Sequence, residues 1–222
     1  AMTESLNQGE VGKRILLFNF PNNPAGYTVT QAEATAICDV LKKSAEAGNR
    51  IVAILDDAYF GLVYEEGVAE ESLFSTLCDL HPNILAVKLD GPTKEDYVWS
   101  FRVGFLTFGF KGTTAAQLKA LEAKAAGVVR SSISNASGIS QALLLKAYTH
   151  PDYDAQKKAK FDTLQKRYDK VREVLAAHPE FQESFEAVPF NSGYFMCVKL
   201  KGVEPEPVRV RLLKDFETGV IV

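Results

Sequence analysis

The chain has 222 residues, of which 46% are hydrophobic and 24% are charged, and its formal net charge is −3. A chain of this size buries a substantial core as one or two domains, and its charge gives no electrostatic reason to bind nucleic acid or an anionic membrane. No apolar run approaches the roughly 18–20 residues of a membrane-spanning helix, and the N-terminus lacks the pattern of a signal peptide. The three cysteines have neither metal-ligand spacing nor a disulfide pattern, so no metal site is predicted.

Strand and helix signals alternate over the first two thirds of the chain. A capping box at Thr30 and Glu33 opens a helix that runs to Gly48, and apolar runs mark the strands. This alternation predicts an α/β sheet covered by helices. The predicted elements, in chain order, are strand 15–18, a helix from 31, strand 51–56, a short helix near 72–80, strands 84–89 and 103–108, helix 113–129, and a helix that ends near Tyr148.

After His150 and Pro151 the pattern changes. Apolar residues at three- and four-residue spacing predict a long amphipathic helix over 153–177. A strand over 194–200 and a helix over 205–218 follow. Cys38, on a predicted helix, and Cys197, in a predicted strand, are interpreted as small core residues.

A stiff asparagine turn follows the first predicted strand. Residues 19–26 read Asn-Phe-Pro-Asn-Asn-Pro-Ala-Gly, so prolines flank Asn22 and Asn23. Such a turn can hold an amide side chain at the carboxyl end of a strand, where ligands of open α/β sheets collect. A plain loop is the alternative interpretation.

Two carboxylates and a phenol follow the second long strand, at Asp56, Asp57 and Tyr59. Adjacent acids at a strand end are costly to bury unless a cation or hydrogen bonds compensate. The protonated pyridine nitrogen of a ligand is such a cation, and Tyr59 could reach a phenolic oxygen on the same ring. A purely structural turn is the alternative here.

A lysine and an arginine follow the third long strand. Residues 90–95 read Asp-Gly-Pro-Thr-Lys-Glu, which places Lys94 at the exit of a Gly-Pro turn, and Arg102 stands eight residues later. A fixed amine beside a fixed guanidinium suits an aldehyde cofactor that carries a phosphate, because the amine forms a Schiff base and the guanidinium neutralises the phosphate.

The three motifs stand in the same order as in class I/II aminotransferases, and the chain resembles that family of fold type I pyridoxal-phosphate enzymes. The family pattern is Asn-Pro-x-Gly, then Asp-x-x-Tyr, then a lysine followed eight residues later by an arginine. This chain has Asn23-Pro24-Ala25-Gly26, then Asp56-Asp57-Ala58-Tyr59, then Lys94 with Arg102.

The resemblance implies a role for each matching residue. Lys94 would form the Schiff base with pyridoxal 5'-phosphate and later carry the proton between the substrate α-carbon and the cofactor. Asp56 would pair with the pyridinium nitrogen and keep the ring an electron sink. Asn23 and Tyr59 would hydrogen-bond the ring oxygen, and Arg102 would bind the phosphate.

Two positions need comment. Asp57 fits the pattern less well than Asp56, because the family's acid precedes the tyrosine by three residues. Many members carry a phosphate-contacting serine three residues before the lysine, where this chain has Gly91. Either Thr93 or backbone N–H groups could replace that contact.

The resemblance also implies the architecture and its extent. Residues 1–150 would be part of the cofactor-binding large domain, a three-layer sheet with helices on both faces. Residues 151–222 would be the interdomain helix and the start of a small α+β C-terminal domain. The family has a longer N-terminal half before Asn23, and its substrate-carboxylate arginine comes later in the chain. Because Arg209 and Arg211 lie in the wrong element for that role, we expect a fragment.

The implied function is amino-group transfer between an amino acid and a 2-oxo acid in a cytoplasmic homodimer, with this chain inactive by itself. No nucleic acid, membrane or metal is expected as a partner. The alternatives are another fold type I pyridoxal-phosphate enzyme, such as a β-lyase or decarboxylase, or a non-catalytic aminotransferase-like binding domain. The sequence does not reveal which amino acid is the substrate.

Overall fold

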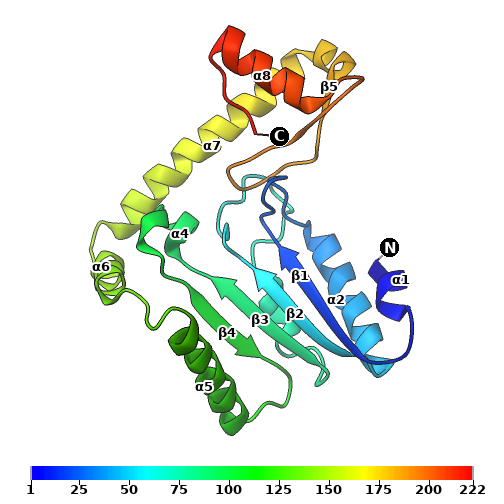
Figure 1. The fold of residues 1–222 in the computed structure, drawn as a ribbon, viewed down its shortest axis with the longest axis vertical. Coiled ribbons are helices and arrows are strands. Elements are labelled where there is room, and N and C mark those ends of the chain that lie inside the picture. Colours follow the sequence, from blue (N-terminus) through cyan, green and yellow to red (C-terminus); the bar gives the residue numbers. More distant parts are fainter. Residues whose placement is uncertain (1, 222) are drawn as a thin grey trace.

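A four-stranded sheet forms the centre of the computed structural model, which describes residues 2–221 (Figure 1). The strand order is β1-β2-β3-β4; the first three strands are parallel, and β4 runs antiparallel to β3. The strands are β1 (Lys13–Asn19), β2 (Arg50–Asp56), β3 (Ile84–Asp90) and β4 (Phe105–Gly109). With helices on both sides, this sheet confirms the predicted α/β class.

Helix α2 (Gln31–Glu46) covers one face of the sheet, with α1 (Met2–Asn7) and α3 (Leu73–Leu77) beside it. The predicted capping box is present. Thr30 Oγ1 accepts a hydrogen bond from the Glu33 amide at 3.2 Å, and Glu33 Oε2 accepts one from the Thr30 amide at 2.8 Å. The first turn of α2 therefore has two of its free N–H groups satisfied at the position that the sequence specifies.

The core lies between this face and α2. In β2, Ile51, Ala53 and Leu55 are at most 2% exposed, and Leu41 of α2 and Leu77 of α3 are fully buried. Alternate residues of a strand point to the same face, so one set of β2 side chains meets the helices. Burying a leucine or isoleucine in this way contributes roughly 1.5–3 kcal/mol.

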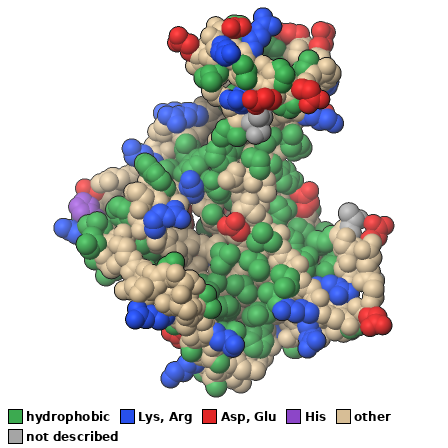
Figure 2. Space-filling model, viewed as in Figure 1, with side chains coloured by type: hydrophobic (Ala, Val, Ile, Leu, Met, Phe, Trp, Pro, Cys, Tyr) green, Lys and Arg blue, Asp and Glu red, His purple; other side chains and the backbone are tan. Residues whose placement is uncertain are grey.

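The opposite face is also apolar and is poorly covered. We call it the apolar sheet face; its residues are paired in register across three strands, as Ile15, Val52 and Leu85, and as Leu17, Ile54 and Val87. Ile15 and Leu17 are 61% and 66% exposed. Figure 2 shows apolar side chains gathered over the sheet on this side. Helix α5 (Ala115–Ser132) lies beside β4 and buries none of its own residues.

Short helical turns and two further helices connect the sheet to a C-terminal lobe. Between β3 and β4 lie α4 (Pro92–Glu95) and η1 (Trp99–Phe101), and α6 (Gly138–Tyr148) follows α5. Helix α7 (Tyr153–Ala177) then extends from the sheet to the lobe (Figure 1). The lobe consists of η2 (Pro179–Glu183), β5 (Phe185–Ala187), β6 (Val198–Leu200) and α8 (Pro205–Phe216). Among the described residues, no helix is long and apolar enough to cross a membrane.

Most predicted elements are present within a few residues of their expected bounds, and α7 matches the predicted helix over 153–177. The strand predicted over 194–200 was wrong in extent, because only 198–200 pairs with β5. Cys197 therefore precedes β6; it is half-buried, and its Sγ lies 3.3 Å from the Pro24 carbonyl oxygen, so its assignment to the core was wrong. Cys38 is buried on α2, as predicted.

We expect this chain, taken alone, to self-associate through the apolar sheet face, because exposed apolar surface beside an unpaired strand edge favours association. Replacing Ile15 and Leu17 together by serine should shift the chain toward monomer without loss of helix content. Light scattering measures the mass of the particles, and circular dichroism measures the helix content. Leu41→Ser, which places a hydroxyl in the core, is the comparison and should unfold the chain. A monodisperse monomer before any substitution would contradict the expectation.

Candidate active site

The carboxyl ends of the three parallel strands lie at one edge of the sheet. Asn19 of β1 is in register with Asp56 of β2, which is in register with Leu89 of β3. Ligands of open α/β sheets bind at this edge. The loops that leave these strands carry Asn23, Tyr59 and Lys94, so the sheet register brings together three segments that are far apart in sequence.

Asn23 and Tyr59 are in direct contact. Asn23 Nδ2 donates a hydrogen bond to Tyr59 Oη at 3.3 Å. The backbone N–H of Asn23 donates one to Asn19 Oδ1 at 2.8 Å. Tyr59 is buried, and this burial raises the pKa of its phenol. The hydrogen bond from Asn23 lowers that pKa, and the negative charge of Asp56 raises it. The three side chains therefore form one electrostatic group.

A distant segment of the chain holds the turn that carries Asn23. Asn191 is buried; its Oδ1 accepts a hydrogen bond from the Thr28 amide at 2.8 Å, and its Nδ2 donates one to the Thr28 carbonyl at 2.9 Å. The Gly26 carbonyl accepts a hydrogen bond from the Asn191 amide at 2.8 Å. Gly26 has φ 71°, and a Cβ there would lie 1.9 Å from the Phe195 carbonyl oxygen. We call this arrangement the Asn191 clamp.

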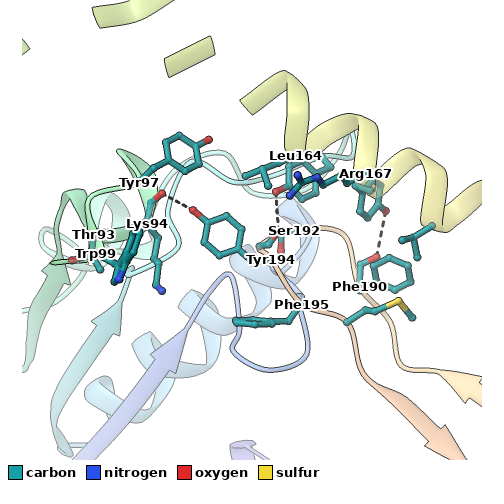
Figure 3. A pocket seen from close by; sticks show the side chains of 15 residues that line it. Thr93, Lys94, Tyr97, Trp99, Leu164, Arg167, Phe190, Ser192, Tyr194 and Phe195 are labelled. Carbon is teal, nitrogen blue, oxygen red and sulfur yellow. Dashed lines mark hydrogen bonds between the residues drawn. The ribbon is translucent and has the colours of Figure 1, made fainter. Parts of the chain in front are cut away.

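Lys94 lies in the short helix α4, which begins at Pro92, a residue whose fixed φ suits the first helical position. Its Nζ lies 5.5 Å from the centroid of the Tyr59 ring and 5.9 Å from that of Tyr194. Tyr194 Oη also donates a hydrogen bond to the Lys94 carbonyl at 2.7 Å (Figure 3). Within residues 2–221 the Lys94 amine has no hydrogen-bond acceptor and no ion-pair partner, so it is available to react.

The two neighbouring acids have different surroundings. Asp56 is half-buried, and its Oδ1 accepts a hydrogen bond from the Ala58 amide at 3.3 Å. Asp57 is 6% exposed, and its Oδ2, which lies 3.9 Å from Lys88 Nζ, accepts no hydrogen bond from a described residue. Burial raises the pKa of Asp57, and the charge of Lys88 opposes that shift. Of the two acids, Asp56 is the one whose charge acts on the Tyr59 phenol.

Arg102 lies after η1, in the segment that leads into β4. It follows η1 in the left-handed region, with φ 54°, and its guanidinium is exposed. Nη1 donates a hydrogen bond to the Trp99 carbonyl at 3.2 Å. Within the described residues, no hydrogen bond or ion pair joins Arg102 to Asn23, Asp56 or Lys94.

A cavity of about 460 Å³ adjoins Lys94 on the side of α7. Figure 3 shows side chains from α4, α7 and the segment before β6 around it. Aromatic residues dominate its wall: Tyr64, Tyr97, Trp99, Tyr168, Phe190, Tyr194 and Phe195. Sequence reasoning missed these residues. The available signal was Gly193 followed by two aromatic residues, but that pattern was interpreted as the beginning of a strand.

Comparison with known proteins agrees with this geometry. The family model described as aminotransferase class I and II matches residues 1–222. The chain belongs to the class I and II aminotransferase family. Comparison with curated proteins finds no match.

Solved aminotransferase structures share the fold. An aminotransferase from Anaerococcus prevotii has 21% sequence identity and a TM-score of 0.70, and the matched region covers 91% of this chain and 47% of that one. An aminotransferase from Mycobacterium tuberculosis has 17% identity and a TM-score of 0.71, with 98% covering 50%. A Thermus thermophilus aspartate aminotransferase mutant has 21% identity and a TM-score of 0.65, with 94% covering 51%. The chain therefore spans about half the length of these aminotransferases.

Aminotransferases of this family depend on pyridoxal 5'-phosphate, and the donor set at the sheet edge fits that cofactor. Lys94 supplies an amine that has no polar partner in the described part of the chain and is suited to an aldehyde. Asn23 and Tyr59 supply an amide and a phenol in contact, suited to a ring oxygen. Asp56 supplies a half-buried carboxylate, suited to a ring nitrogen. The described residues show no group of His, Cys, Asp and Glu side chains that could hold a metal ion.

The glycine that replaces the frequent serine of this family has a steric explanation. A Cβ on Gly91 would lie 2.8 Å from the Val103 carbonyl oxygen and 3.0 Å from the Gly104 Cα. Both atoms belong to the backbone that leads into β4, which cannot yield as a flexible side chain would. The close approach of this backbone therefore excludes a side chain at position 91.

We expect Gly91→Ser to lower the free energy of unfolding by about 1–3 kcal/mol, because it forces a side chain into a filled space. Chemical denaturation measures the change. Gly138→Ser is the matched control, because a Cβ at Gly138 meets no atom within 4 Å. Equal stability of the two variants would contradict the steric explanation.

Proposed function

We propose that this chain is one half of a longer aminotransferase that transfers an amino group between an amino acid and a 2-oxo acid. The observation that carries the proposal is the Lys94 amine beside the Asn23–Tyr59 pair at the carboxyl edge of the sheet, with no polar partner among the described residues. The amine lies within 6 Å of the centroids of two aromatic rings, those of Tyr59 and Tyr194.

Each side chain at the edge has a role in this proposal. Lys94 would hold the cofactor through its amine and, once displaced by the amino group of the substrate, would move the proton at the substrate α-carbon. Within the described residues this amine has no polar partner and lies 5.5 Å from the centroid of the Tyr59 ring. When bound, pyridoxal phosphate supplies an electron sink for the bonds at that carbon. Asn23 and Tyr59 would donate hydrogen bonds to the ring oxygen, and Asp56 would keep the ring nitrogen protonated.

Arg102 is proposed to bind the phosphate. Its guanidinium is exposed and has one backbone partner, the Trp99 carbonyl, so it can turn toward an anion at small cost. Since Gly91 offers no hydroxyl, the remaining phosphate donors are proposed to be the Thr93 hydroxyl and the first N–H groups of α4.

The domain division also belongs to the proposal. Residues 1–150 form part of the large cofactor-binding domain, and residues 151–222 form the interdomain helix and part of the small domain. The enzyme is proposed to act as a cytoplasmic homodimer. The chain by itself is proposed to be inactive. It spans about half the length of related aminotransferases, so we infer that the other half supplies further ligand contacts. Each missing hydrogen bond to a charged ligand group costs roughly 1.5–3 kcal/mol.

The first test concerns Lys94. In the full-length protein, added pyridoxal phosphate should produce a visible absorption band, and borohydride reduction should fix the cofactor on the peptide that contains Lys94. Peptide mass spectrometry reports the modified residue. Modification of Lys88 or Lys111, with Lys94 unmodified, would refute the assignment. The chain alone is the second sample, and a coupled 2-oxo acid assay should detect no turnover from it.

The second test separates the two acids. Asp56→Asn in the full-length protein should retain the fold and lower turnover by about 10²–10³-fold, as expected for a lost preorganised electrostatic contact. Steady-state kinetics and circular dichroism are the measurements. A neutral amide cannot keep the ring nitrogen protonated.

Asp57→Asn is the matched control. Burial raises the pKa of the Asp57 carboxyl in the folded state. The folded state therefore loses stability as the pH rises above the pKa of this carboxyl in the unfolded chain, about 3.9. Asp57→Asn should therefore leave stability at pH 7 equal or higher and keep turnover. Loss of turnover in Asp57→Asn, with Asp56→Asn active, would show that the assignment is wrong by one residue.

A further inference from the structure

Two acids directly follow Lys94, and both are bound by side chains from the start of α7 and the end of α6. Lys157 Nζ lies 2.6 Å from Glu95 Oε1 and 3.2 Å from Asp96 Oδ1. Tyr148 Oη donates a hydrogen bond to Asp96 Oδ2 at 2.8 Å, and Tyr153 Oη donates one to Asp96 Oδ1 at 2.5 Å. We call these five residues the Asp96 network.

The Asp96 network differs from the other ion pairs of α7. The Asp96 side chain is 8% exposed, and those of Lys157 and Glu95 are 32% exposed. Lys158 and Asp162, which pair one residue further along the helix, are 74% and 45% exposed. Exposed pairs contribute little, whereas breaking a buried pair leaves an uncompensated charge. The Asp96 network therefore holds its elements together more strongly than a surface pair would.

The protonation behaviour of the network agrees with its geometry. Burial and the hydrogen bond to Asp96 raise the pKa of Tyr153 to about 12. Burial lowers the pKa of Lys157, but its hydrogen bond to Glu95 and the charges of Glu95 and Asp96 outweigh that effect and raise it overall. The ion pairs and the phenol donors are thus intact at neutral pH.

Helix α4 has little stability of its own. It contains four residues, fewer than an isolated helix needs to persist, and the turn after it is unfavourable because Tyr97 has φ 60°. The backbone N–H of Asp96 donates to the Pro92 carbonyl at 3.0 Å, so the backbone of Asp96 closes the last turn of α4. What holds Asp96 therefore also holds the backbone that presents Lys94.

We propose that Asp96 and Lys157 are positioning residues that fix the position of the Lys94 amine and couple this position to helix α7. The proposal rests on the function proposed above. Asp96 contacts neither the cofactor nor the substrate in this scheme; it acts through the α4 backbone. A displacement of the first turns of α7 would be transmitted to Lys94 through these contacts.

The test uses two substitutions of opposite charge in the full-length protein, Asp96→Asn and Lys157→Met. If the network acted on Lys94 by charge alone, removing the carboxylate would lower the pKa of the amine, removing the ammonium would raise it, and their effects would be opposite. If the network positions Lys94, both substitutions should impair it in the same direction. Lys158→Met is the matched control, because it removes an exposed ion pair from the same helix.

Two readouts follow Lys94 directly. The first is the rate of its modification by pyridoxal phosphate and borohydride, and the second is its reactivity with acetic anhydride without cofactor, with both measured by peptide mass spectrometry. We expect both rates to fall about tenfold in Asp96→Asn and in Lys157→Met, as the loss of a hydrogen bond to a charged group implies, and to stay unchanged in Lys158→Met. Lys157→Arg should restore most of the loss.

Thermal unfolding separates positioning from misfolding. If Asp96→Asn does not fold, Tyr153→Phe, which removes one donor and no charge, takes its place and should still slow both modifications. Rates equal to those of the unsubstituted protein in both charge variants, or changes of opposite sign, would overturn the positioning role. Absence of Lys94 modification in the unsubstituted protein would instead overturn the proposed function, and the acetic anhydride readout would still test the network.

Discussion

The parallel register of β1, β2 and β3 is the constraint on which the candidate active site depends. It aligns Asn19, Asp56 and Leu89 at one edge, so that the three following loops begin side by side. A shift of one residue would move the apolar residues of a strand to the opposite face and would also displace its loop. The side chains that fill the core fix the strand register, and the register in turn fixes where the loops of the site begin.

The neighbouring acids illustrate how strand geometry assigns chemistry. Successive residues at a strand end point in different directions, so Asp56 and Asp57 do not share an environment. Asp56 remains half-buried and its charge acts on Tyr59, whereas Asp57 is buried with its Oδ2 3.9 Å from Lys88 Nζ. Two adjacent identical side chains thus have different surroundings from position alone, and burial raises the pKa of Asp57.

Much of the fold was predictable from local sequence signals. The capping box at Thr30 and the long apolar stripe of α7 act over one or a few helical turns, and the structure has both helices where the sequence indicates them. The positions of Asn23 and Lys94 just beyond the strand ends follow from the turn residues there. These are features whose cause lies within a few residues.

The remaining features depend on contacts between distant segments. The hydrogen bond from Tyr194 to the Lys94 carbonyl spans a hundred residues, and no local pattern at Tyr194 distinguishes it from a strand residue. The Asp96 network likewise joins residues of α4 to a helix far along the chain. Arg102 was predicted from its spacing, but its left-handed backbone and exposure depend on how η1 leads into β4.

The Asn191 clamp gives the C-terminal lobe a second attachment to the sheet. The chain leaves the sheet along α7 and returns before β6, where Asn191 binds the turn that carries Asn23 (Figure 1). An element attached by one helix can swing freely, whereas one attached at two separated points can rotate only about the line that joins them. A rotation of the lobe is therefore restricted to one axis, and it would displace the turn that carries Asn23.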